Sequence, residues 1–193
     1  KCLTKPHLKT LPAQPPISLR RLRIVHQQLH VLPLGLGSLA FLELLALGSN
    51  KLRVLPGELL QLKELRTLEV GDNCLEFLPS GLGQLSSLRE LDVSSNSLCE
   101  VPESVGRLRT LQRLNLSCNK LLELPESFGQ LGLLKELDLD KNQLKGLPAS
   151  FMLLVSLPQG WTYSNTEFSS SSLSARVPTD LSWPVRLLDG TRT

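Results

Sequence analysis

Residues Leu85–Arg107 read LSSLRELDVSSNSLCEVPESVGR, and this stretch recurs with small changes before and after itself. Steps of 23 residues lead to LAFLELLALGSNKLRVLPGELLQ at Leu39, LKELRTLEVGDNCLEFLPSGLGQ at Leu62, LRTLQRLNLSCNKLLELPESFGQ at Leu108 and LGLLKELDLDKNQLKGLPASFML at Leu131. Because all of these copies share one register, the chain is predicted to be an array of repeats rather than a domain with a single centre.

The array has weaker ends. The unit over residues 16–38 keeps its leucines but carries Gln27 where the other units have asparagine, and Pro158 interrupts a further unit that has only begun. We therefore predict three segments: a partial repeat and proline-rich link over 1–15, about six repeats and an incomplete seventh over 16–157, and a serine-rich, non-repeat and largely disordered tail over 158–193.

Each unit contains two local patterns. Residues 90–94 alternate polar and apolar side chains, which predicts a strand with one buried face. Pro102, Val105 and Leu108 then follow at helix-like spacing, and a proline suits the first turn because its missing N–H would have no partner there. Neighbouring units are expected to pair their strands in parallel, with the helical turns on the opposite side.

The pattern L-x-x-L-x-L-x-x-N-x-L resembles the leucine-rich repeat family over about residues 8–157. The period and the LPxxLGxLxxL turns are similar to the intracellular repeats of Ras-suppressor, Shoc-type and Scribble-type scaffolds. The resemblance implies an α/β solenoid, a right-handed leucine-rich repeat horseshoe with short parallel strands on its concave face and 3₁₀ or helical turns on its convex face. It also implies a non-enzymatic adaptor that binds signalling proteins, commonly small GTPases or phosphatase subunits.

One asparagine in each strong unit marks the point where the chain leaves the strand and turns inward. A buried turn deprives backbone groups of water, and an amide can both donate to and accept from them. We predict a structural ladder of Asn50, Asn73, Asn96, Asn119 and Asn142. Since Gln27 is longer by one methylene, distortion or fraying is expected in its unit.

The distribution of charge limits the kinds of partner that the sequence predicts, and the cysteine content limits the cellular compartment. Residues 1–38 hold six bases and no acid, whereas residues 39–157 hold 12 bases and 15 acids, which argues against nucleic-acid binding by the array. The four cysteines form no C-x-x-C pair and no terminal cluster of the kind that the resemblance implies for secreted members. We predict reduced thiols in the cytoplasm, with peripheral attachment at the inner membrane surface as a variant and one disulfide pair as the minority alternative.

The outward strand positions form an extended surface that becomes acidic from its middle onward. We predict that it binds a protein partner, and the competing interpretation is a solvated face that serves only solubility. The candidate binding residues are Arg66, Glu69, Arg89, Glu90, Asp92, Arg113, Asn115, Glu136, Asp138 and Asp140.

No catalytic residue, metal site or cofactor is predicted. All three histidines lie within residues 1–38, far along the array from the acidic outward positions of the strands, which argues against a catalytic His–Asp pair. His26 and His30 lack further ligands at metal-binding spacing. No apolar run is long enough to span a membrane. The predicted function is a protein-interaction scaffold in intracellular signalling. Two alternatives stay open, a sensor portion of a larger multidomain signalling enzyme or death-domain protein, and extracellular recognition, which would require cysteine caps; the oligomeric state is also open.

Overall fold

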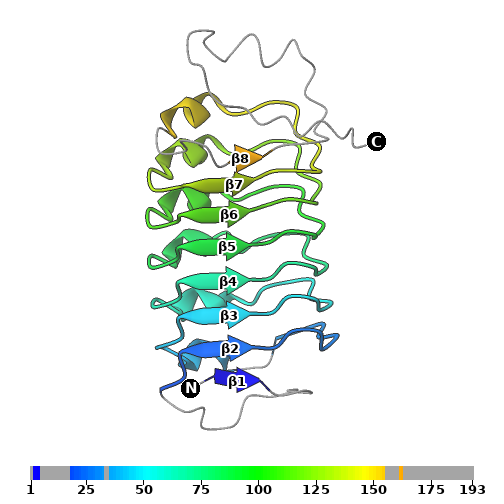
Figure 1. Ribbon diagram of the computed structural model, residues 1–193, viewed down its shortest axis with the longest axis vertical. Helices are drawn as coiled ribbons and strands as arrows, with labels where there is room; N and C mark the ends of the chain where they lie inside the picture. The colour runs from blue at the N-terminus through cyan, green and yellow to red at the C-terminus, as the bar shows by residue number, and fades with distance from the viewer. Residues whose placement is uncertain (1, 5–17, 33–34, 155–160, 163–193) are drawn as a thin grey trace, which may run out of the picture.

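The computed structural model describes residues 2–4, 18–32, 35–154 and 161–162. Across these residues, eight short strands form one parallel sheet in chain order, so that each strand lies beside its predecessor (Figure 1). The strands are β1 Cys2–Thr4, β2 Arg21–Arg23, β3 Leu44–Ala46, β4 Thr67–Glu69, β5 Glu90–Asp92, β6 Arg113–Asn115, β7 Glu136–Asp138 and β8 Trp161–Thr162.

The register of the sheet follows the sequence period. From β2 to β7 every pair of neighbouring strands joins residues 23 apart, as in Leu68 opposite Leu91. The central leucine of each of these strands is at most 2% exposed, while its two neighbours in the strand point to the other face of the sheet. The predicted strands and their parallel pairing are confirmed.

Short 3₁₀ helices lie behind the sheet in Figure 1 and return the chain toward the next strand. They are η1 Leu36–Ser38, η2 Gly57–Gln61, η3 Leu82–Gln84, η4 Glu103–Arg107, η5 Glu126–Gln130 and η6 Ala149–Leu153. A proline directly precedes four of them, and in η4 the Val105 N–H donates to the Pro102 carbonyl at 3.0 Å. The predicted leucine-rich repeat horseshoe, with strands on one face and 3₁₀ turns on the other, is confirmed.

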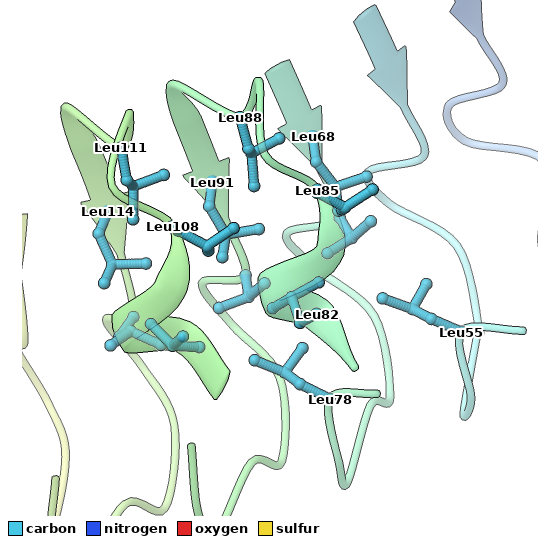
Figure 2. Packing of buried hydrophobic residues seen from close by; sticks show 14 of the residues in the cluster. Leu55, Leu68, Leu78, Leu82, Leu85, Leu88, Leu91, Leu108, Leu111 and Leu114 are labelled. Atoms are coloured by element: carbon cyan, nitrogen blue, oxygen red, sulfur yellow. The ribbon is translucent and has the colours of Figure 1, made fainter. Parts of the chain in front are cut away.

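The core consists of rows of leucines that run along the stack. Each 23-residue repeat forms one turn of the solenoid, which is called a coil. In Figure 2, Leu85, Leu88 and Leu91 of one coil lie beside Leu108, Leu111 and Leu114 of the next, and all six side chains are at most 2% exposed. Burying one such side chain contributes about 1.5–3 kcal/mol. Because each coil buries its leucines against its neighbours, stability resides in the interfaces between coils.

The ladder asparagines tie each coil to the one before it. The Asn96 side-chain Nδ2 donates to the carbonyls of Val93 and Ser94 in its own coil, and to Val70 of the preceding coil at 3.1 Å. Its Oδ1 accepts the Leu75 N–H at 2.9 Å. The same pattern recurs at Asn50, Asn73, Asn119 and Asn142.

The first described coil departs from this pattern. The Gln27 Nε2 donates to the carbonyl of Val25 in its own coil, at 3.1 Å. In every coil from β2 to β7 the residue before the ladder position has a positive φ, but only here does the residue after it, Gln28, have one too, at 55°. The expected distortion is therefore present, and it is a local change of turn conformation beside a strand that keeps its register.

On the convex side, glycine allows neighbouring 3₁₀ helices to approach closely. A Cβ added at Gly106 in η4 would lie 2.4 Å from the carbonyl oxygen and 2.5 Å from the Cβ of Ser127 in η5. A carboxylate also crosses between coils, because Glu126 accepts the N–H groups of Ala149 and Ser150 at 3.2 and 3.0 Å. The first residue of η5 thus caps the start of η6.

Both ends of the sheet deviate from the period. The β1–β2 pairing joins residues 19 apart, and the β7–β8 pairing joins residues 24 apart, as in Leu137 opposite Trp161. The sheet therefore extends into the segment after residue 157, where the sequence shows no repeat. The rest of the predicted link (1–15) and tail (158–193) lies outside the described residues, as do residues 16–17, 33–34 and 155–157 of the predicted repeat array.

Candidate partner-binding face

The outward side chains of the strands surround a groove in the middle of the sheet. It has a volume of about 430 Å³ and crosses β4, β5, β6 and β7. Its floor is the strand backbone at Leu68, Leu91, Leu114 and Leu137, whose side chains point into the core and are at most 2% exposed. Its polar lining is Thr67, Glu69, Glu90, Asp92, Arg113, Asn115, Glu136 and Asp138.

Seven of the ten predicted binding residues lie in this lining. Arg66, Arg89 and Asp140 do not: the two arginines are exposed immediately before β4 and β5, and Asp140 follows β7. Sequence reasoning omitted Thr67 from the candidates, although it occupies the same column as Glu90 and Arg113. The 23-residue spacing of Thr67 from Glu90 was the available signal, but the candidates in this column were chosen by their charge, which Thr67 lacks.

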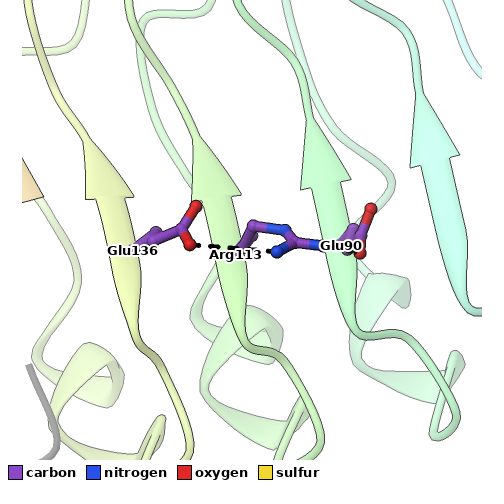
Figure 3. Close-up of polar contacts among 3 residues, drawn as sticks. All are labelled: Glu90, Arg113 and Glu136. Carbon is purple, nitrogen blue, oxygen red and sulfur yellow. Dashed lines mark hydrogen bonds and ion pairs between the residues drawn. The ribbon is translucent and has the colours of Figure 1, made fainter. Parts of the chain in front are cut away.

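The first residues of β4–β7 form the first column of the groove, which consists of Thr67, Glu90, Arg113 and Glu136. Arg113 links its two neighbours in this column. Figure 3 shows its guanidinium on β6 between Glu90 on β5 and Glu136 on β7. It donates a hydrogen bond to Glu90 and lies 3.8 Å from Glu136 Oε1. The hydrogen bond to Glu90, followed by the charge of the same carboxylate, raises the pKa of Arg113 further above its ordinary value. Arg113 therefore stays charged throughout the accessible pH range.

The last residues of β4–β7 form the middle column of the face, Glu69, Asp92, Asn115 and Asp138. Three of these side chains accept hydrogen bonds from the turn that follows their own strand. Asp92 Oδ1 accepts the Ser94 N–H at 2.9 Å, and Asp138 Oδ1 accepts the Asp140 N–H at 3.0 Å. Asn115 Oδ1 likewise accepts two hydrogen bonds from Ser117, one from its N–H at 3.0 Å and one from its hydroxyl at 2.7 Å. These turns begin where each strand ends, and they fix the direction of each side chain before any partner binds.

Gly71 makes room for this arrangement in the neighbouring coil. A Cβ at Gly71 would lie 2.9 Å from Ser94 Oγ and 3.3 Å from Asp92 Oδ1. The absence of a side chain at Gly71 thus lets the Asp92 carboxylate rest against the preceding coil. A larger residue there would have to displace it.

The groove carries a net negative charge. Its lining holds five carboxylates and one guanidinium. Arg113 offsets part of the charge of Glu90 and Glu136, and Arg23 reaches Glu69 at 3.4 Å from two coils away. Asp92 and Asp138 add negative charge in the middle column. Such a face attracts basic groups and speeds their encounter.

The described residues meet neither the requirements of a metal site nor those of a membrane-spanning helix. They contain no group of three His, Cys, Asp or Glu side chains placed to hold a metal ion. Cys74, Cys99 and Cys118 are free thiols. In the part of the chain that the structure describes, no helix is both long and apolar enough to cross a membrane.

Comparison with known proteins identifies the repeat. The family model described as leucine rich repeat matches residues 40–98 and 101–159, which is more than half of the chain. This protein belongs to the leucine-rich repeat family. Its members are typically non-enzymatic, and the fold is commonly a protein-interaction module. No curated protein sequence matches the chain.

Three solved leucine-rich repeat structures resemble this one. A leucine-rich repeat protein of Leptospira interrogans is 32% identical with a TM-score of 0.64, over 82% of this chain and 46% of that one. The plant peptide hormone receptor RGFR1, in complex with RGF2, is 39% identical with a TM-score of 0.70, over 76% and 24%. The ectodomain of the Arabidopsis thaliana receptor kinase GASSHO1/SCHENGEN3, in complex with CASPARIAN STRIP INTEGRITY FACTOR 2, is 35% identical with a TM-score of 0.68, over 78% and 18%.

The leucine-rich repeat chain described here thus spans less than half the length of each of these neighbours. Two of the neighbours were solved with a bound ligand, as their names state. The likeness establishes the repeat and the arrangement of its strands. The assignment to the Ras-suppressor, Shoc or Scribble type stays a prediction.

Proposed function

We propose that this protein is a non-enzymatic scaffold that binds a basic or mixed-charge segment of a protein partner in the groove over β4–β7. One observation carries the proposal: acidic side chains that their own backbone already orients line an open groove across four strands. Because Asp92 and Asp138 are held before binding, less side-chain entropy is lost when a partner arrives.

The groove does not suit catalysis. A pair of catalytic carboxylates requires a site that excludes water and raises the pKa of one of them. Glu90 and Glu136 instead lie on an open sheet with side chains 39% and 61% exposed, and Arg113 lies between them. Their arrangement supports recognition of charge rather than proton transfer.

We further propose that the chain acts in the cytoplasm, or at the inner membrane surface, in a signalling assembly with a small GTPase or a phosphatase subunit as partner. The free thiols at Cys74, Cys99 and Cys118 are compatible with a reducing compartment. A second candidate is the recognition portion of a larger multidomain signalling protein. It is favoured by the short span of this chain relative to its structural neighbours.

Charge reversal in the groove tests the function. Asp92→Lys combined with Asp138→Lys should weaken binding of lysine-rich extended peptides by about tenfold or more and abolish capture of a crosslinked partner from extract, because attraction becomes repulsion. Fluorescence anisotropy at low and at physiological salt measures the peptides. The melting temperature should change little, since both side chains lie outside the core.

The matched control is Glu64→Lys combined with Glu123→Lys. Both residues are exposed and outside the groove lining, so the net charge changes by the same amount. The control should bind as the unchanged protein does. Equal loss in both double variants would show that binding depends on net charge alone, and no loss in either would remove the groove as the binding site.

A further inference from the structure

The turns that leave the strands, at the right-hand edge of Figure 1, form a lateral face of the stack. In the coil of β3, Leu52 and Leu55 of this turn are buried, while Lys51, Arg53 and Val54 are exposed. Because the pairing offset of 23 residues is the same from β2 to β7, equivalent outward positions of successive coils form columns along the stack.

One of these columns is apolar in three successive coils. Val31, Val54 and Phe77 are 75%, 68% and 58% exposed, and together they are called the lateral strip. The next two coils hold Glu100 and Glu123 at the same position, so the strip has a definite end. Single exposed apolar residues are ordinary on a protein surface, but a contiguous row of them indicates an interaction site.

Two opposite charges flank the centre of the lateral strip. Arg53 immediately precedes Val54, and Glu76 immediately precedes Phe77, so the two charged residues occupy one column in adjacent coils. Both are exposed. Among the described residues, no ion pair within 4.0 Å includes either of them.

We propose that the lateral strip is the centre of a two-fold symmetric dimer of this chain, in which the two solenoids lie antiparallel. In such an interface, if one residue contacts a second residue of the other copy, the reverse contact also forms. With the axis between the coils of Val54 and Phe77, Val54 of each copy faces Phe77 of the other. Arg53 of each copy then faces Glu76 of the other.

Other antiparallel alignments are less favourable. An axis through Val54 would match all three apolar residues but place Arg53 opposite the Arg53 of the second copy. An axis through Phe77 would place Val54 opposite Glu100. The axis between the two coils leaves Val31 opposite Glu100, so its apolar contact comes from Val54 and Phe77. Only the alignment between the two coils combines apolar contact with two reciprocal ion pairs. The charge pattern of the strip is therefore complementary to itself, which favours a second copy of this chain over an unrelated partner.

The dimer is expected to be weak and reversible. Val54 and Phe77 of each copy, with two ion pairs, give an interface toward the lower limit of stable complexes, below about 1,200 Å² in total. Interfaces of this class commonly dissociate in about the micromolar range. Because the lateral face is separate from the groove over β4–β7, the dimer does not depend on the proposed function.

Two single charge variants test the alignment. Arg53→Glu and Glu76→Arg should each lower the association constant by about tenfold or more, because each places like charges opposite one another twice. An equimolar mixture of the two variants should recover the association of the unchanged protein, since 53 and 76 then carry opposite charges at both contacts. Sedimentation velocity of the full chain over a range of concentrations measures each sample and the mixture.

Two further variants address the apolar centre. Phe77→Asp should abolish the dimer, whereas Leu133→Asp, which replaces a residue 52% exposed outside the lateral strip, should leave it unchanged. A chain that is monomeric at every concentration would overturn the proposal, as would a mixture of Arg53→Glu and Glu76→Arg that fails to associate. A loss of thermal stability in Phe77→Asp without any change of mass would also overturn it, because the strip would then be covered by the same chain.

Discussion

The coil that contains Gln27 and the coil that contains Asn96 make the same turn in different ways. Asn96 makes four hydrogen bonds to backbone groups, two of them in the preceding coil, and the turn needs only one residue with a positive φ. Gln27 donates to the Val25 carbonyl, and Gln28 adopts a second positive φ. One additional methylene therefore changes both the hydrogen bonding and the backbone conformation of the turn.

The convex sides of the same two coils differ as well. A Cβ at Gly106 would lie 2.4 Å from the Ser127 carbonyl oxygen, whereas a Cβ at Gly37 would lie 2.4 Å from the Oε1 of the Gln61 side chain and 3.2 Å from the nearest backbone atom, the Glu58 carbonyl oxygen. Gln61 is exposed, and the end of its side chain can move. The central coils are thus closely fitted on both faces, and the first described coil tolerates more change.

Removal of the ladder amide should produce the largest difference between the two coils. Asn96→Ala leaves buried carbonyls and a buried N–H without their partner, and we expect a loss of about 3 kcal/mol in the free energy of unfolding. Gln27→Ala should lose less than about 1 kcal/mol, because its amide donates to the Val25 carbonyl at an exposed position. Urea unfolding of both variants measures the comparison. Equal losses would contradict the interpretation that the ladder asparagine differs from Gln27.

A methyl group added on the convex side should give the next largest difference. Gly106→Ala forces backbone to move in η4 or η5, and a loss of about 2–3 kcal/mol is expected. Gly37→Ala should lose less than about 1 kcal/mol, because the Gln61 side chain can rotate away. Thermal unfolding of both variants measures the difference in their losses of stability. Gly57→Ala, which meets nothing within 4 Å, is the neutral control.

Glycine substitution in the turn should give the smallest effects, with opposite signs. Gln28→Gly should raise stability by about 0.5 kcal/mol, because glycine accepts a positive φ without steric cost. Ser97 occupies the equivalent position in the central coil and has no positive φ, so Ser97→Gly should lower stability by about 0.5–1 kcal/mol. Differential scanning calorimetry of the pair measures the sign. The same sign for both would contradict the assigned turn conformations.

The repeat made most of the fold predictable from the sequence. A fixed 23-residue spacing of leucines sets the register of the strands, because any other offset would move buried leucines such as Leu91 to the surface. The position of Asn96 at the end of a strand likewise indicated its hydrogen bonds to the turn. Most of the groove lining followed from the outward strand positions, which alternate with the buried ones.

The features that the sequence did not reveal depend on exposed side chains and on the ends of the array. Arg113 lies between Glu90 and Glu136 only because its side chain adopts one of many available conformations. Arg23 reaches Glu69 two coils away, across the small side chain of Ala46, which no pairwise pattern indicates. The 24-residue offset of β8 could not be predicted either, since the repeat pattern ends before that strand.

The uniform offset between β2 and β7 has a consequence for how such a protein can change in length. Each coil presents one surface to the coil before it and an equivalent surface to the coil after it, and five successive strand pairs use the same offset. A whole unit such as residues 85–107 could therefore be deleted or duplicated, and the leucines on either side would still meet leucines. The reach of the groove can thus vary in steps of one coil while the interior keeps a single pattern of packing.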